Sequence, residues 1–151
     1  AWRKKLQSFQ GIKPRNQPRG FVGTLRDYQR DGLGWLHFLR EFGFGGCLAD
    51  DMGLGKTIQV LSLLQSLKAG RKKEETPQPS LVVVPRSLVF NWMQEAAKFS
   101  PQLKVLDFAH KERGQQLAQL SEYDLIITTY GTLLRDILKL KDISFDYALL
   151  D

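Results

Sequence analysis

The sequence predicts an α/β fold in which a parallel sheet is covered by helices on both faces. Short apolar segments of strand length alternate along the chain with longer segments that carry apolar residues at helical spacing. The expected strands are almost entirely apolar, which is typical of strands buried on both sides. With 151 residues and 42% hydrophobic content, the chain is long enough for one domain with its own core.

The first half of the chain predicts a helix, a strand, a glycine-rich loop and a second helix. Apolar residues at helical spacing predict a helix that begins near Leu25 and ends at Gly43. Residues 44–49 are apolar and flanked by glycines, which predicts a buried strand with Cys47 as a small core residue. Four more apolar residues at helical spacing predict the second helix, which ends near Gly70: Ile58, Leu61, Leu64 and Leu67.

The second half repeats the alternation after a charged, proline-containing loop over residues 71–80. Strands are expected at residues 81–84, 103–108, 124–130 and 147–150, and helices at 87–99, 111–121 and 132–139. In parallel sheets, ligands gather where the strands have their carboxyl ends. Residues at those ends are therefore the first candidates for a site.

Residues 50–57 read Asp-Asp-Met-Gly-Leu-Gly-Lys-Thr, which predicts a phosphate-binding loop for ATP or GTP. Gly53 and Gly55 allow a tight turn whose backbone N–H groups converge on phosphate oxygens. Lys56 supplies a charge for the phosphates and Thr57 a hydroxyl for Mg²⁺, at the start of the helix. The pattern G-x-x-x-x-G-K-[ST] has glycine at its first position, where this chain has Asp50. A triplet that only caps a helix is the alternative explanation.

Asp151 follows the apolar run of residues 147–150, which places a carboxylate at the end of an expected strand. Mg²⁺ prefers hard oxygen ligands and retains several waters, so Thr57, Asp151 and phosphate oxygens suffice to hold it. We therefore expect Thr57 and Asp151 to share the metal. The alternative is that Asp151 is only the last residue of the sequence.

The net charge of +6 is concentrated in residues 1–20, which contain six basic residues and no acidic one. We interpret this segment as a basic arm or linker and residues 21–151 as the folded domain. A basic arm favours a nucleic-acid partner, and a solvated linker explains it equally well. No apolar stretch is long enough to cross a bilayer, and the amino-terminal segment lacks the apolar centre of a signal peptide. We expect an intracellular protein, cytoplasmic or nuclear, without a membrane partner.

Four ordered motifs resemble those of the Swi/Snf-type ATPases of helicase superfamily two, over about residues 20 to 151. The first is Leu-Arg-Asp-Tyr-Gln at 25–29, and the second is Leu-Ala-Asp-Asp-Met-Gly-Leu-Gly-Lys-Thr-Ile-Gln at 48–59. The third is Pro-Arg-Ser-Leu at 85–88 with Asn91-Trp92, Glu95, Lys98 and Phe99, and the fourth is Thr-Thr-Tyr at 128–130. Acidic residues ahead of Met-Gly-Leu-Gly-Lys-Thr are usual in this family, which accounts for Asp50.

The resemblance implies a P-loop NTPase of the first RecA-like lobe, incomplete because the sequence ends at its Walker B aspartate, Asp151. It implies that Gln29 reads the adenine edge and that Lys56 and Asp151 act in catalysis. Nucleotide binding extends over the loop itself: Asp51, Met52, Gly53, Leu54, Gly55, Lys56 and Thr57. Contacts to the DNA backbone are implied for residues at two strand ends: Pro85, Arg86, Ser87, Thr128 and Thr129. Without the resemblance, each has an ordinary structural explanation. Arg86 and Ser87 would cap a helix, and Thr128 and Thr129 would be β-forming residues at the end of a strand. Gln29 would be an ordinary polar residue of a helix.

The family further implies ATP and Mg²⁺ as cofactors, and double-stranded DNA and protein–DNA complexes as the partners of a translocating parent protein. Its catalytic glutamate is expected directly after Asp151, and its arginine fingers lie in a second RecA-like lobe that this sequence lacks. We therefore expect the fragment to bind nucleotide without hydrolysing it efficiently. A non-catalytic DNA- or protein-docking module and a strand-separating helicase remain the alternatives.

Several conspicuous residues are expected to have no chemical role. Four aromatic residues lie in helical patterns and are interpreted as core: Trp35, Phe38, Phe42 and Trp92. His37 and His110 are remote from any cluster with metal-ligand spacing.

Overall fold

The computed structural model describes residues 11–151 except 52, 73–75 and 111–112. It contains a four-stranded parallel sheet in the order β2-β3-β1-β4. The strands are β1 (Ser80–Val84), β2 (Val105–Asp107), β3 (Leu125–Thr129) and β4 (Ala148–Leu150). All residues of β1 and β3 are buried, as the near-continuous apolar runs predict. The predicted parallel sheet is confirmed.

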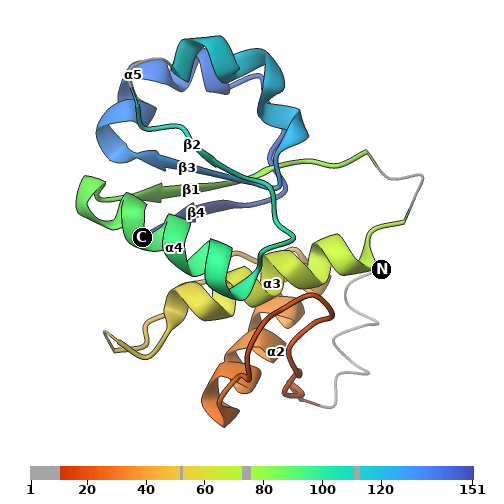
Figure 1. Cartoon of the computed structure of the whole chain (residues 1–151). Coiled ribbons are helices and arrows are strands. Elements are labelled where there is room, and N and C mark those ends of the chain that lie inside the picture. The colour runs from red at the N-terminus through yellow and green to blue at the C-terminus, as the bar shows by residue number, and fades with distance from the viewer. Residues whose placement is uncertain (1–10, 52, 73–75, 111–112) are drawn as a thin grey trace.

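Helices cover both faces of the sheet (Figure 1). On one face lie α3 (Lys56–Gly70) and α4 (Val89–Phe99), which pack on Val82, Val84 and Ile127. The other face holds α5 (Tyr130–Leu140) and the 3-10 helix η2 (Arg113–Glu122), packed on Leu81, Val83 and Ile126. Successive strand residues therefore belong to opposite layers, as the pleat of a strand requires.

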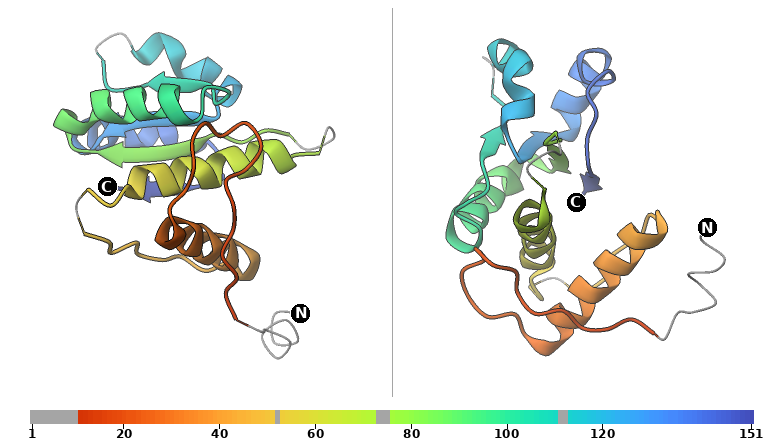
Figure 2. Two further views of the ribbon diagram at one scale, coloured as in Figure 1. Left: turned by 60° about the horizontal axis from the view of Figure 1, so that its bottom comes forward. Right: turned by 90° about the vertical axis from the view of Figure 1, so that its right-hand side faces the viewer.

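The helix α2 (Asp27–Phe42) lies outside α3 and forms an additional layer (Figure 2). Leu25 and Leu33 pack against Leu63 of α3 in a small separate core. Residues ahead of α2 lie along it: the Arg15 backbone N–H donates to the Arg30 carbonyl at 3.0 Å. The second half of the basic segment thus contacts the folded domain, while residues 1–10 lie outside the described part.

The strand expected at residues 44–49 is wrong. These residues pair with none of the described strands, and most of them are exposed. A strand needs a neighbour for its N–H and C=O groups, and an apolar run does not guarantee one. Cys47 is accordingly exposed, so its assignment to the core is also wrong.

Other boundaries shift in smaller ways. A short 3-10 turn, η1 (Arg86–Leu88), precedes α4, and the polar segment expected as a helix at 111–121 is 3-10 from Arg113 onward. Trp35, Phe38 and Phe42 are half-buried, whereas Trp92 is buried in the core. None of the described helices is both long and apolar enough to span a membrane.

An ion pair joins η2 to α5 over the sheet. Arg113 donates from Nε to Asp136 Oδ2 at 2.5 Å, and Lys139 Nζ lies 3.3 Å from Asp136 Oδ1. The hydrogen bond from Arg113 lowers the pKa of Asp136, against the opposing effect of burial. Asp136 is therefore charged near neutral pH and stabilises the folded state in that form.

Replacing Asp136→Asn is expected to lower the free energy of unfolding at pH 7 by about 1 to 3 kcal/mol, because Arg113 loses a charged partner. The folded-state pKa lies below the unfolded value of about 3.9. The stabilisation is therefore complete above that value and disappears as pH falls through the folded pKa. Urea unfolding at pH values from 7 down to 3 measures this pH-dependent stabilisation. Asp142→Asn, at an exposed position, is the control. An equal effect of Asp136→Asn at all pH values would contradict this assignment.

Candidate nucleotide-binding site

The phosphate-loop candidate connects to the first turn of α3. Gly53 and Gly55 have φ values of 83° and 78°, in the left-handed region that favours glycine. A Cβ atom on Gly55 would also lie only 2.6 Å from Gln29 Nε2. Both glycines predicted to shape the loop are therefore required by its conformation.

The Lys56 side chain folds back onto the backbone of the loop that precedes it. Its Nζ donates to the Asp50 carbonyl at 2.6 Å and to the Asp51 carbonyl at 3.1 Å. Because Lys56 is the first residue of α3, its ammonium group lies next to a helix N-terminus, where N–H groups have no partner within the helix. Lysine, left-handed glycines and helix N-terminus together suit a phosphate group.

Gln29 holds the loop against the start of α2. It is 5% exposed, and its Oε1 accepts from the Arg26 N–H at 2.9 Å. Its Nε2 donates to the Leu54 carbonyl at 3.2 Å, and the Tyr28 hydroxyl donates to the same carbonyl at 3.1 Å. Both ends of the Gln29 amide are thus bonded within the chain.

A small cavity of about 170 Å³ adjoins Gln29 and the loop. Phe21 and Phe99 line it, and their rings stack with centroids 5.9 Å apart and planes 11° apart. Arg26 also lines it, together with Gly53, Leu54 and Gly55 of the loop. Aromatic, amide and guanidinium groups therefore surround a space directly beside the phosphate-loop candidate.

Asp50, where the strict motif has glycine, has a structural contact that the sequence did not reveal. Its Oδ2 accepts from Gln59 Nε2 at 2.9 Å, and Gln59 is completely buried in α3. A Cβ on Gly32 would lie 1.8 Å from Gln59 Oε1, so α2 and α3 approach closely at this point. The carboxylate of Asp50 therefore fastens the loop to the helix that follows it.

Asp151 lies at the carboxyl end of β4. The first turn of α3, which contains Thr57, lies at the same end of the strands (Figures 1 and 2). Its backbone N–H donates to the Val83 carbonyl at 2.9 Å. Its Oδ2 accepts from Trp92 Nε1 at 2.8 Å, and the Tyr130 hydroxyl donates to its backbone carbonyl at 2.7 Å. Asp151 Oδ1 has no hydrogen bond to the residues that the structure describes.

Trp92 was interpreted only as a core residue, and its bond to Asp151 is a contact that sequence reasoning missed. A usable signal existed, because the indole N–H of a buried tryptophan normally has an acceptor. Of the other predicted nucleotide-binding residues, Asp51 and Leu54 lie in the exposed part of the loop, and Met52 lies outside the described residues.

The predicted DNA-contact residues differ in accessibility. Pro85, Arg86 and Ser87 are exposed at the carboxyl end of β1. Thr128 and Thr129 are buried: Thr128 Oγ1 donates to the Phe108 carbonyl at 3.3 Å, and Thr129 Oγ1 caps α5 by accepting from the Thr132 N–H at 3.2 Å. Their hydroxyls are therefore used inside the fold.

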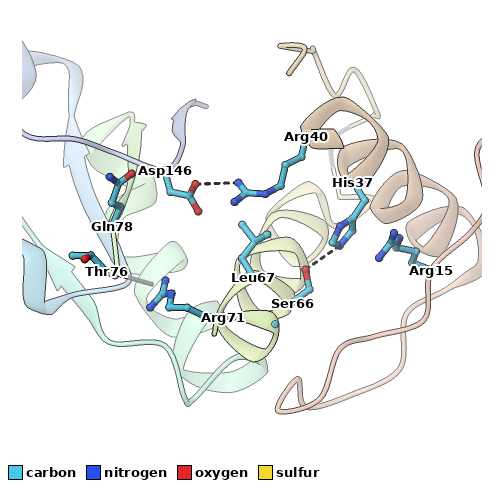
Figure 3. Close-up of a pocket in the computed structure, with 10 residues that line it drawn as sticks. Arg15, His37, Arg40, Ser66, Leu67, Arg71, Thr76, Gln78 and Asp146 are labelled. Carbon is cyan, nitrogen blue, oxygen red and sulfur yellow. Dashed lines mark hydrogen bonds and ion pairs between the residues drawn. The ribbon is translucent and has the colours of Figure 1, made fainter. Parts of the chain in front are cut away.

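A cavity of about 620 Å³ lies at the opposite end of the strands (Figure 3). Arg40 of α2 donates to Asp146 at 3.0 Å, and its guanidinium lies 5.3 Å from the Tyr147 ring centroid. His37 Nε2 lies 2.9 Å from Ser66 Oγ. Burial, followed by the charges of Arg15 and Arg40, lowers the pKa of His37 to about 4. His37 is thus neutral at pH 7 and helps join α2 to α3.

Together, the parallel sheet with helices on both faces and the loop before α3 define a RecA-like lobe. The chain belongs to the family described as SNF2-related domain, whose profile matches residues 28–151.

Relatives and solved structures agree with this family. The chain is 39% identical, over 98% of its length, to "Putative ATP-dependent helicase/translocase YwqA" of Bacillus subtilis, and 37% identical, over 92%, to "TATA-binding protein-associated factor MOT1" of Saccharomyces cerevisiae. It spans 16% and 8% of those proteins. The Sulfolobus solfataricus SWI2/SNF2 ATPase core in complex with dsDNA superposes with a TM-score of 0.78 at 41% identity, covering 95% of this chain and 28% of that one. The family and fold predicted from the motifs are confirmed.

A double-mutant cycle tests the bond between Trp92 and Asp151. Trp92→Phe keeps an aromatic ring in the core but removes the N–H donor, and Asp151→Ala removes the acceptor. We expect a coupling free energy of about 0.5 to 1.5 kcal/mol in urea unfolding at pH 7, as for a net hydrogen bond. Strictly additive effects of the two substitutions would show that the bond does not form in solution.

Proposed function

We propose that this chain is the ATP-binding part of an ATP-dependent translocase on double-stranded DNA. The single observation that carries the proposal is the arrangement of Lys56, the two left-handed glycines and the N-terminus of α3 around one loop. The names of the relatives include ATP-dependent helicases, and the solved neighbour is a DNA complex, which supports the same function for the parent protein.

In this proposal, each residue has a defined task at the nucleotide. Lys56 Nζ leaves the carbonyls of Asp50 and Asp51 and donates to phosphate oxygens, while the backbone N–H groups around Gly53 and Gly55 bind the same anion. Gln29 and Arg26 border the cavity beside the loop. Beyond its bonds to Arg26 and Leu54, the Gln29 amide keeps one N–H and one oxygen lone pair for the base. The Phe21 and Phe99 rings supply the apolar part of its wall.

Thr57 and Asp151 are proposed to hold Mg²⁺ together with phosphate oxygens. Among the described residues there is no group of three His, Cys, Asp or Glu side chains that could hold a metal by itself. A hydroxyl and one carboxylate oxygen suit a cation that takes its remaining ligands from phosphate and water. When bound, Mg²⁺ would neutralise charge on the phosphates. Trp92 orients Asp151 by occupying Oδ2 and leaving Oδ1 for the metal.

DNA is proposed to contact the exposed strand end at Pro85, Arg86 and Ser87. The Arg86 side chain and the N–H groups of the 3-10 turn that begins there are suited to backbone phosphates. Thr128 and Thr129 would contribute through their backbone at most, because their hydroxyls are bonded within the fold. Translocation itself requires the second RecA-like lobe of the parent protein.

Titration with ATP and Mg²⁺ by calorimetry tests the nucleotide site. Lys56→Ala is expected to weaken binding by about ten- to a hundredfold, since it removes a charged donor to phosphate worth about 1.5 to 3 kcal/mol. Lys104→Ala removes the same charge at the amino end of β2 and is expected to bind as the unmodified chain does. Equal affinities of the Lys56 and Lys104 variants for ATP would contradict the proposed ATP site.

Asp50→Gly restores the strict form of the motif, and we nevertheless expect it to weaken ATP binding several-fold. The substitution removes the acceptor for Gln59 Nε2, so the loop loses its connection to α3. Asp50→Asn is the matched control, because its side-chain oxygen can still accept from Gln59 Nε2. The same calorimetric titration measures both. Tighter binding by Asp50→Gly than by the unmodified chain would refute the role of Asp50.

A further inference from the structure

A basic cavity of about 320 Å³ lies on the side of the sheet away from β4. Its described lining consists of Arg86, Ala109, His110, Arg113 and Arg135. They come from the end of β1, the segment after β2, η2 and α5. Three guanidinium groups and an imidazole therefore converge from three parts of the chain that are distant in sequence: the end of β1, residues 109–113, and α5.

One of the three arginines is fixed in place by the fold. Arg113 donates from Nε to Asp136 and from Nη1 to the His110 carbonyl at 2.9 Å. Asp136 is 4% exposed and also pairs with Lys139, so its charge is balanced behind the cavity wall. His110 is held in turn, with Nε2 3.0 Å from Gln116 Oε1. These contacts give the cavity a preorganised wall.

The other two arginines supply the excess positive charge. Arg86 and Arg135 are exposed, and neither forms an ion pair with an acidic residue in the described part of the chain. The carboxylate of Asp107, next to the lining, accepts from the Ala109 N–H at 2.8 Å. No carboxylate belongs to the described lining itself. The site is therefore suited to an anion.

The chemistry of the lining favours a phosphate group over a whole nucleotide. Guanidinium groups bind phosphate oxygens through paired N–H donors, and arginine is favoured for this task. The described lining has neither an aromatic ring other than imidazole nor a glycine-rich turn. It shares Arg86 with the exposed strand end proposed to contact DNA.

We propose that this cavity binds one phosphodiester group of the DNA backbone, with Arg135 of α5 as a contact beside Arg86. The proposal rests on the DNA-binding part of the proposed function and extends it to residues outside the family motifs. Arg113 and His110 act by holding the wall on which the phosphate lies. DNA would thus follow the sheet edge from the end of β1 toward α5 and η2.

Salt-dependent binding of a fluorescent DNA duplex, followed by anisotropy, tests the subsite. Each phosphate contact contributes about 0.9 to the slope of log K against log salt concentration. Arg135→Ala is expected to reduce the magnitude of the slope by about 0.9 and the affinity about three- to tenfold near 0.1 M salt. Arg86→Ala is expected to act similarly. Lys104→Ala removes an exposed charge at the opposite end of β2 and is expected to leave the slope unchanged.

The possible results distinguish a failure of the phosphate subsite from a failure of the DNA-binding proposal. A reduced slope for Arg86→Ala with an unchanged slope for Arg135→Ala overturns the subsite while DNA binding stands. Failure of the unmodified chain to bind the duplex overturns both. An NMR titration identifies the source of the phosphate: a shift of the Arg135 Nε–H resonance with inorganic phosphate but not with duplex overturns the DNA assignment. Urea unfolding of each variant shows whether a loss of binding reflects loss of the fold.

Discussion

The parallel pairing of β1 with β3 and β4 determines where the candidate residues at the strand ends lie. In this register Val84 is opposite Thr129 and Val83 is opposite Leu150, so the three strands end at one edge of the sheet. Arg86, Thr129 and Asp151 follow or close these strands and are brought together there. Nucleotide and DNA candidates lie on one edge because the strands are parallel.

The phosphate-loop candidate is positioned mainly by side chains that bond to it from outside. Tyr28 and Gln29 of α2 donate to the Leu54 carbonyl, and Gln59 of α3 donates to Asp50. These bonds hold the loop at both ends while leaving Gly53 with open space around its Cβ position. Within the described residues, the Lys56 ammonium bonds only to carbonyl oxygens of the loop, and exchanging these contacts for an anion would break none of the bonds from Tyr28, Gln29 and Gln59. The loop is therefore held in place by side chains of α2 and α3, while the contacts of the Lys56 ammonium can be replaced by those of a ligand.

The features predictable from sequence were those set by local pattern. The buried strands β1 and β3 follow from their apolar runs, and the loop follows from its glycines and Lys56. Residues 44–49 have the same apolar character, yet they form no ladder among the described residues, because strand formation also depends on a neighbouring edge. The exposed state of Cys47 follows from this failure.

The contacts that sequence reasoning missed join residues far apart in the chain. Trp92 reaches Asp151 across 59 positions, and Arg113 reaches Asp136 across 23. A buried indole or guanidinium requires a partner, so the need could be foreseen while the partner could not. Thr129 shows a related limit: a hydroxyl at a strand end is equally suited to DNA contact and helix capping, and here it caps α5.

The helix α2 connects the two ends of the sheet. Gln29 in its first turn bonds to the phosphate-loop candidate, while Arg40 in its last turn bonds to Asp146 just before β4. A helix of 16 residues spans about 24 Å, which is enough to reach both contacts. Asp146, which accepts from Arg40, lies just before β4, and Asp151 lies just after it. The helix α2 therefore positions the phosphate-loop candidate relative to the start of the strand that leads to Asp151.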